Sequence, residues 1–156
     1  FAQCANPTVV VGTGASAASP AWAVNLRASA PTGRGFISYD MEDAGSAVLV
    51  APDVNAWYAG DFAGNDFTKI YAVETLAVPS LYEINTTTGV RTLIGSTGLA
   101  DGSNVGGMAW DYTTSTMYAN SGPNLYTIDL TTGTMTLVGS MAPCDPWLAG
   151  GFRETA

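Results

Sequence analysis

The sequence contains no histidine, and its side chains carry little charge of either sign. Asp, Glu, Lys and Arg make up 12% of the residues, against about 25% in a typical soluble domain. Without histidine the chain lacks the usual general base of catalytic triads and the imidazole ligands of metal sites. We therefore expect no cofactor, and a polar surface made largely of Ser, Thr, Asn and Gly.

Positive charge is especially scarce. Lys and Arg together number 5, and the formal net charge is -8. Binding to the phosphates of nucleic acids needs clustered Lys and Arg, and so does docking on anionic lipid. No apolar run approaches the roughly 18 residues that a membrane-spanning helix needs. We therefore expect neither nucleic-acid binding nor a membrane span.

Cysteine occurs only at Cys4 and Cys144. A lone pair without C-x-x-C spacing does not indicate zinc. In a chain rich in Thr and Gly that begins with Phe, such a pair of cysteines is typical of a processed, secreted protein in an oxidising setting. We expect an extracellular protein with a disulfide between these two residues, within a subunit or between subunits. The alternative is two unrelated buried thiols.

Helical periodicity is almost absent, because no dozen residues place apolar side chains at i, i+3, i+4 and i+7. Short runs rich in Val, Ile, Tyr, Thr and Trp, bounded by Gly, Pro and Asn, predict strands instead. The predicted strands cover residues 8–11, 22–26, 35–39, 47–50, 56–62, 69–74, 80–84, 90–94, 105–110, 116–119, 124–128, 134–138 and 147–152.

One hairpin sequence occurs twice, as INTTTGVRTLIGS at 84–96 and as IDLTTGTMTLVGS at 128–140. Asn85 and Asp129 stand at the turn start, where a short polar side chain bonds the backbone two residues on. Gly89 and Gly133 stand where such a loop needs a positive φ.

A weaker third copy lies in GFISYDMEDAGSAVLV at 35–50, with Asp40 at the turn start and Gly45 as the turn glycine. Within the hairpins, Tyr82 and Ile84 alternate with Glu83. This alternation predicts a sheet with one buried face.

A second signature interleaves with the hairpins. WYAGDF at 57–62 matches WLAGGF at 147–152, and VGGMAW at 105–110 lies between them. KIYAVE at 69–74 follows WYAGDF, and TMYAN at 116–120 follows VGGMAW. The repeat is thus four strands over about 45 residues, the period of a β-propeller blade.

The stretch GGMAWDYTTSTMYANSGPNLYTIDLTTGTMTLVGS at 106–140 resembles a blade of bacterial extracellular β-propeller repeat proteins with Leu-Tyr-x-Ile-Asp-x-x-Thr-Gly hairpins. The resemblance covers residues 35–152. It implies an all-β fold of about three blade-like, four-stranded antiparallel repeats, a partial β-propeller; a compact β-sandwich or barrel is the alternative. Because closed propellers have roughly four to eight blades, such a chain is a piece of a longer propeller or is completed by copies of itself.

Residues 1–34 do not fit the repeat. We therefore divide the chain into an N-terminal strand with a flexible tether, residues 1–34, and a repeat domain, residues 35–156. The strand is short and Val-rich, and a Gly/Ser/Ala tether follows it. It can close the chain's own sheet or be donated to a neighbour's sheet, and head-to-tail donation builds rings or open filaments. The proposed donor strand consists of Thr8, Val9, Val10, Val11 and Gly12.

Carboxylates offer two other interpretations. Asp40, Glu42 and Asp43 have the oxygen chemistry of a calcium site, but the repeat places them in a hairpin turn, which favours a solvated acidic turn. A pair of carboxylates for glycoside hydrolysis is the second interpretation, and the sequence selects no pair. Its candidates are Asp61, Asp66, Glu74 and Asp111.

Aromatic side chains and one turn asparagine complete the candidates. The tryptophans could form a sugar-stacking surface, although their place in repeated strands favours core packing. Asn85, in the sequence NTT, is a candidate N-glycosylation acceptor. The four tryptophans are Trp22, Trp57, Trp110 and Trp147.

These observations favour a non-enzymatic, secreted structural protein that self-assembles into an extracellular fibre or pilus-like filament through strand exchange. Its expected partners are copies of itself, as a homo-oligomer or helical polymer, and a glycan is a further candidate. One alternative is a fragment of a larger β-propeller that binds a glycan or protein ligand. Another is a propeller lactonase or glycosidase.

Overall fold

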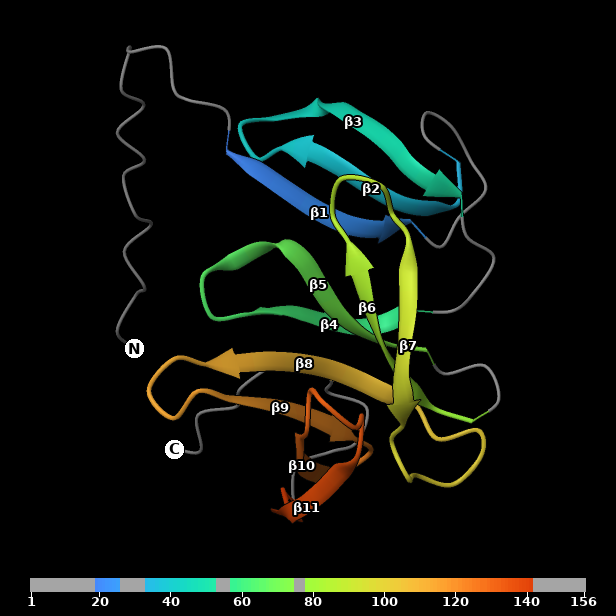
Figure 1. Ribbon diagram of the computed structural model, residues 1–156, viewed down its shortest axis with the longest axis vertical. Helices are drawn as coiled ribbons and strands as arrows, with labels where there is room; N and C mark the ends of the chain where they lie inside the picture. Colours follow the sequence, from blue (N-terminus) through green and yellow to red (C-terminus); the bar gives the residue numbers. More distant parts are fainter. Residues whose placement is uncertain (1–18, 26–32, 53–56, 75–77, 142–156) are drawn as a thin grey trace, which may run out of the picture.

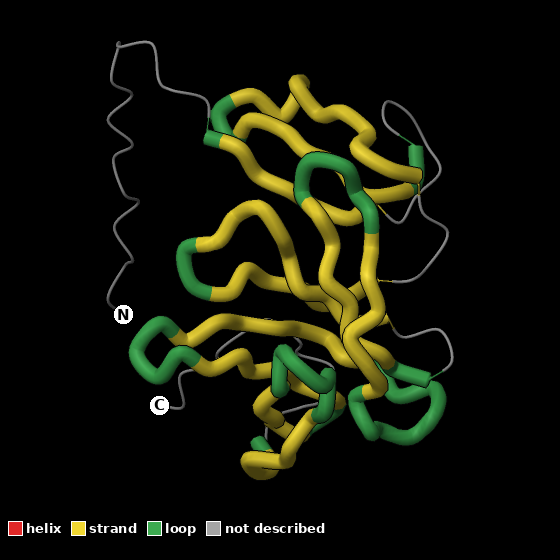
Figure 2. The backbone as a smooth tube through the Cα atoms, in the orientation of Figure 1, coloured by secondary structure: helices red, strands yellow, loops and turns green. Residues whose placement is uncertain are grey.

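The computed structural model describes residues 19–25, 33–52, 57–74 and 78–141. Within these ranges every regular element is a strand, as Figure 2 shows, so the all-β prediction is confirmed. No helix long and apolar enough to cross a bilayer occurs in this part of the chain.

The strands form three antiparallel sheets, in each of which neighbours in the sequence are neighbours in space. Sheet 1 contains β1 (Pro20–Asn25), β2 (Gly35–Asp40) and β3 (Asp43–Pro52). Sheet 2 contains β4 (Trp57–Ala63), β5 (Asp66–Glu74), β6 (Ser80–Asn85) and β7 (Arg91–Ser96). Sheet 3 contains β8 (Val105–Asp111), β9 (Thr116–Ser121), β10 (Asn124–Ile128) and β11 (Met135–Ser140). None of the three closes into a barrel through its described strands.

Sheets 2 and 3 each contain the four strands that the repeat predicts, in the predicted order. Sheet 1 extends the pattern toward the N-terminus, because β1 pairs with β2 and places Trp22 opposite Ser38 and Val24 opposite Phe36. Residues 20–25 fall within the predicted N-terminal segment 1–34 and lie in one sheet with β2 and β3. Figure 1 shows sheet 2 between the other two sheets.

Sheet 2 is buried on both faces, whereas the alternation of Tyr82, Glu83 and Ile84 predicted one buried face. Ile84 is 3% exposed and packs toward sheet 1, while Leu81 is 0% exposed and packs toward sheet 3. Successive strand residues point to opposite faces. Leu81, which directly precedes the alternating residues 82–84, is therefore enough to provide an apolar side chain on the second face. We call the face of each sheet toward the next sheet along the chain its forward face, and the opposite one its backward face.

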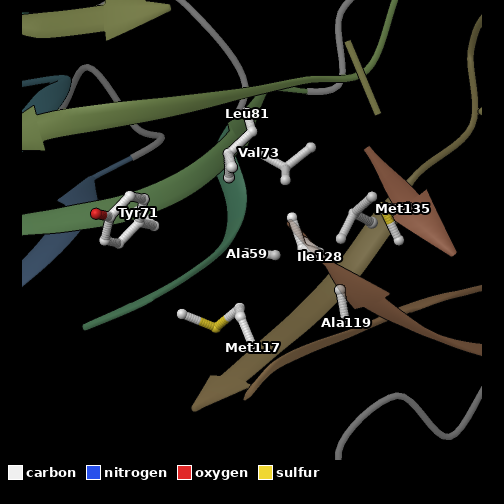
Figure 3. Packing of buried hydrophobic residues seen from close by; sticks show 9 residues of the cluster. Ala59, Tyr71, Val73, Leu81, Met117, Ala119, Ile128 and Met135 are labelled. Atoms are coloured by element: carbon white, nitrogen blue, oxygen red, sulfur yellow. The ribbon is translucent and has the colours of Figure 1, made fainter. Parts of the chain in front are cut away.

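The larger buried cluster lies between sheets 2 and 3, as Figure 3 shows. Side chains of β5 and β6 meet those of β9 and β10 across the interface, in line with two sheets packed about 10 Å apart. Its buried members are Ala59, Tyr71, Val73, Leu81, Val105, Met117, Ala119, Ile128 and Met135.

A smaller cluster joins sheets 1 and 2. Phe36 of β2 is buried against Ala72 and Ile84, and Trp22 packs at its margin. The indole Nε1 of Trp22 donates a hydrogen bond of 3.1 Å to the carbonyl oxygen of Thr86 in the β6–β7 turn. This bond ties β1 to the second repeat.

The first strands of sheets 2 and 3, β4 and β8, lie side by side. The backbone amide of Trp110 in β8 donates a 2.8 Å hydrogen bond to Asp61 Oδ2 in β4. We call the first strand of a four-stranded sheet its inner strand. Neighbouring repeats therefore meet through their inner strands as well as through their sheet faces.

Candidate functional site

The turn glycines of the two matching hairpins have the predicted backbone conformation. Gly89 has φ 68° and Gly133 has φ 84°. The Gly89 amide donates to the Asn85 carbonyl oxygen at 2.8 Å, and the Gly133 amide donates to that of Asp129 at 2.8 Å. The prediction of a left-handed glycine at the end of each turn is confirmed.

Gly45 is not a turn glycine, and the prediction for the third hairpin is wrong. Asp40 pairs directly with Asp43, so the turn consists of Met41 and Glu42 alone. Gly45 lies inside β3 without a positive φ, and its amide donates to Asp43 Oδ1 at 2.9 Å. This turn is shorter than the loops of the other two hairpins and leaves no position that needs a left-handed residue.

Each turn glycine also contacts the outer strand of the preceding sheet. A Cβ on Gly89 would overlap Ala51 in β3, and a Cβ on Gly133 would lie 2.6 Å from the carbonyl oxygen of Gly95 in β7. Ala51 and Gly95 occupy the same repeat position, which in β11 belongs to Gly139. A Cβ on Gly139 would meet no atom within 4 Å. Among the described residues, sheet 3 thus has no equivalent of the contact that closes the other two junctions.

The first residue of each of the two matching turns stabilises its turn through hydrogen bonds to its side chain. Asp129 Oδ1 accepts hydrogen bonds from the amides of Thr131 at 2.7 Å and Thr132 at 3.3 Å. These bonds favour the charged form, and the bond from Thr131 is the main cause that holds the pKa of Asp129 below its ordinary value. Asn85, in the equivalent turn, accepts from Thr87 and Thr88 in the same way.

We predict that the protein loses stability in acid and that the change Asp129→Asn weakens this loss. A carboxyl whose pKa is lowered in the folded state stabilises the fold fully above its ordinary pKa of about 3.9. That stabilisation disappears as the pH falls through the lowered pKa. Asparagine keeps the acceptor oxygen and cannot titrate, so the free energy of unfolding of the variant should depend less on pH below about pH 4.

Chemical denaturation at several pH values, from neutral to about pH 2, measures this dependence. The matched control is Asp101→Asn, since Asp101 is exposed and lies outside the repeated hairpin turns. An unchanged acid transition in the Asp129→Asn variant would contradict the role given to this turn.

The calcium candidates are engaged in the β2–β3 turn. Asp40 Oδ1 accepts hydrogen bonds from the amides of Ser19 at 3.2 Å and Glu42 at 3.1 Å, and Asp43 Oδ1 accepts from Gly45. Among the described residues no group of three or more Asp, Glu, Cys or His side chains could hold a metal ion. The turn is built by its own acidic residues.

The four carboxylates considered for glycoside hydrolysis each have a hydrogen-bond partner. Asp61 bonds the amides of Phe62 and Trp110. Hydrogen bonds from Thr68 and from Thr114 lower the pKa of Asp66 and of Asp111, respectively. Glu74 bonds Tyr82, whose pKa is raised mainly by burial. The structure brings Asp61 to the junction of β4 and β8. Asp66 begins β5 and Asp111 ends β8, beside two turns that a 3.1 Å hydrogen bond from the Tyr112 hydroxyl to the Gly64 carbonyl oxygen joins.

The aromatic and glycosylation candidates lie in different environments. Trp22 and Trp110 are half-buried and pack at the margins of the two clusters, as the repeat suggested. Asn85 is exposed on its turn. Trp147 and the side chain of Trp57 lie outside what the structure describes. So do Cys4, Cys144 and the whole proposed donor strand, residues 8–12.

The candidate site is the edge of sheet 1 that β1 forms. Sheet 1 has three described strands where sheets 2 and 3 have four, and β1 stands at its edge. Between sheets 1 and 2, next to β1, lies a cavity of about 240 Å³, lined by Trp22, Ala23, Val24, Phe36, Ala59, Gly60, Ile70, Ala72 and Ile84. Sequence reasoning predicted that a sheet would accept a donated strand but did not locate the open edge at β1, although the unmatched copy of the inner-strand sequence at 147–152 indicates that one repeat lacks its own.

The two ends of the stack carry apolar residues at positions that are buried elsewhere. Leu125 on the forward face of sheet 3 is half-buried, while its equivalent Leu81 is 0% exposed. Tyr39 on the backward face of sheet 1 is half-buried, while its equivalent Ile84 is 3% exposed. Leu125 and Tyr39 belong to neither buried cluster of the described residues.

No family model, no curated protein and no solved structure matches the chain.

Proposed function

We propose that the protein is a non-enzymatic, secreted structural protein that assembles into an extracellular fibre or pilus-like filament by exchanging strands between copies. The observation that carries the proposal is the three-stranded sheet 1, whose edge strand β1 stands where the other repeats add a fourth strand. A row of unpaired backbone groups at a sheet edge is a template for another chain.

The two end faces support the same proposal. The forward face of sheet 3 and the backward face of sheet 1 carry the residue types that pack against each other inside the chain. Surfaces of two different kinds that fit each other produce a head-to-tail contact, which continues indefinitely unless its rotation closes a ring.

The same geometry favours one second candidate, a piece of a larger β-propeller that binds a glycan or protein ligand. Three consecutive meander sheets are what a segment of such a ring would contain. Light scattering separates the two, since a filament is far heavier than the 16.1 kDa chain. A protein that stays monomeric at high concentration would contradict the filament proposal.

The donor strand of residues 8–12 and the disulfide between Cys4 and Cys144 are parts of this proposal. A Val-rich strand left alone is prone to aggregate, so it needs a partner. The tether that follows provides the reach to a neighbour, and the disulfide would fasten the joined segments.

We expect the change Val10→Asp to abolish or strongly reduce assembly while leaving the repeats folded, since it places a charge inside the donated strand. Electron microscopy measures the filaments, and circular dichroism measures the fold. Ser16→Asp in the tether is the matched control and should assemble normally. Normal filaments from the Val10→Asp variant, or from a chain lacking residues 1–14, would refute the role of this strand.

A further inference from the structure

The backbone of β1 presents bonding groups away from β2. The Met41 amide donates to the Ser19 carbonyl oxygen at 2.9 Å, which makes Ser19 and Met41 a hydrogen-bonded pair. Hydrogen-bonded and non-bonded pairs alternate along an antiparallel ladder. Ala21 and Ala23 therefore bond β2, and the N–H and C=O groups of Trp22 and Val24 point toward the edge of the sheet.

Sheets 2 and 3 show which strand belongs at such an edge. In sheet 2 the inner strand β4 pairs with β5 and places Ala59 opposite Val73, Gly60 opposite Ala72 and Asp61 opposite Tyr71. In sheet 3 β8 pairs with β9 in the same way, with Gly107 opposite Asn120. Both inner strands shift register at the residue before the small one, Tyr58 in β4 and Gly106 in β8.

The sequence contains one more segment with the inner-strand pattern than the described sheets use. WLAGGF at 147–152 repeats the Trp-x-Ala-Gly pattern of WYAGDF in β4. On the acceptor side, Trp22, Ala23 and Val24 of β1 correspond to Tyr71, Ala72 and Val73 of β5. The edge and the unmatched segment thus share the Ala-Val and Trp-x-Ala-Gly residues of an inner pair that the structure shows.

One cavity touches both the edge strand β1 and the inner strand β4 of the next sheet. It lies between the facing sides of sheets 1 and 2, and its lining residues are Trp22, Ala23, Val24 and Phe36 of sheet 1 and Ala59, Gly60, Ile70, Ala72 and Ile84 of sheet 2. Since β4 and β8 lie side by side where sheets 2 and 3 meet, a strand added to β1 would lie beside β4 in the same manner. Such a strand would give the junction of sheets 1 and 2 the pair of adjacent inner strands that the junction of sheets 2 and 3 has.

The length of the connection decides which copy provides this strand. The chain crosses from β3 to β4 with residues 53–56 and from β7 to β8 with residues 97–104. Residues 141–146 separate β11 from the WLAGGF segment, a connection of similar length. A connection of that length reaches the next sheet position beyond sheet 3, whereas sheet 1 of the same chain lies on the far side of sheet 2 (Figure 1).

We propose that residues 147–152 of one copy form the inner strand of sheet 1 in a second copy. The expected register places Ala149 opposite Val24, Gly150 opposite Ala23 and Gly151 opposite Trp22 of the acceptor. The forward face of sheet 3 in the donor then packs on the backward face of sheet 1 in the acceptor. This inference rests on the proposed self-assembly and names its partner, a second copy of the chain, and its contact.

The N-terminal segment at 8–12 fits this edge less well. An added Cβ at Gly60 would lie 2.9 Å from the Tyr71 carbonyl oxygen and 3.2 Å from the Ala72 Cβ, so β4 leaves no room for a larger residue at this position. The segment Thr-Val-Val-Val-Gly offers β-branched residues where β4 has Ala and Gly. We therefore assign the free edge of β1 to residues 147–152. Residues 8–12, the proposed donor strand, would then pair at another place in the assembly.

A cysteine cross-link between two differently substituted full-length chains tests the register. Chains carrying Val24→Cys are mixed with chains carrying Ala149→Cys and oxidised during assembly. Directly opposite, hydrogen-bonded residues have Cα atoms about 5.5 Å apart, which is within the range of a disulfide. We expect a covalent dimer whose linked peptides, identified by mass spectrometry, contain positions 24 and 149.

The matched control mixes Ala23→Cys with Ala149→Cys. Position 23 points to the opposite face from position 24, so its cross-link should be several-fold weaker. Equal cross-linking of both pairs, or filaments of normal length without a 24–149 link, would overturn the inference and leave the proposed function standing. A link that forms only inside one chain that carries both substitutions would overturn it in favour of self-closure.

A truncated chain gives a second, independent measurement. A variant that lacks residues 147–156 can accept a strand at β1 but cannot donate one. Added in small amounts to the intact protein, it should shorten the filaments in proportion to its mole fraction. Filament lengths that do not depend on this variant would contradict the donor role, whereas an intact protein that forms no polymer contradicts the proposed function itself.

Discussion

Replacing Leu81 with alanine is expected to lower the free energy of unfolding by about 2–5 kcal/mol, which is the usual cost of removing a buried leucine side chain and leaving a cavity. Leu81 is 0% exposed and lies in the cluster between sheets 2 and 3. Its neighbours come from two repeats, so the cavity weakens the contact between sheets as well as sheet 2 itself. Urea or guanidinium denaturation of the unassembled subunit measures the loss.

The repeat provides a matched control at Leu125. This residue occupies the same position in sheet 3, opposite Gly139 as Leu81 is opposite Gly95. It is half-buried and belongs to neither cluster of the described residues. Leu125→Ala should therefore destabilise the unassembled subunit much less than Leu81→Ala. Equal losses would show that the forward face of sheet 3 is covered in the free subunit.

Replacing Gly133 with alanine is expected to cost about 2–5 kcal/mol through two separate effects. A left-handed backbone costs a residue with a Cβ roughly 1–2 kcal/mol, and Gly133 has φ 84°. The added Cβ would also lie 2.6 Å from the carbonyl oxygen of Gly95, so the β10–β11 turn would have to move away from sheet 2. Forced overpacking of this kind costs typically about 1–3 kcal/mol.

Gly122→Ala separates the two effects in the same denaturation experiment. Gly122 has φ 54°, yet an added Cβ there would meet nothing within 4 Å. This variant should show the conformational cost alone. Similar losses at both glycines would contradict a contribution from the contact with Gly95.

Local features of the fold follow from short stretches of sequence. The hairpin turns form as predicted because Asn85 and Asp129 bond amides two and three residues on, and because Gly89 and Gly133 accept a positive φ. These interactions span only a few residues, so a sequence pattern contains all of their parts. The order of four strands in each repeat is predictable for the same reason.

The third hairpin shows where local reasoning fails. The segment from Asp40 to Gly45 has turn residues at both ends, yet the structure places the turn at Met41 and Glu42 and pairs Asp40 with Asp43. Register along β2 and β3 decides this, because Ile37 pairs with Leu49 and Phe36 with Ala51. A pairing over the whole hairpin outweighs the preference of a single glycine.

The sequence by itself determined the all-β class, the repeat and its turn chemistry, since each depends on residues close together in the chain. Only the tertiary structure decided that β1 joins β2 and β3, that sheet 2 is buried on both faces, and that sheet 1 has one described strand fewer than its neighbours. Those facts depend on contacts between residues far apart in the chain, such as the hydrogen bond from Trp22 to Thr86. Burial of apolar surface between sheets is non-directional, so the same alternating pattern fits one covered face or two, and the packing partners make the choice.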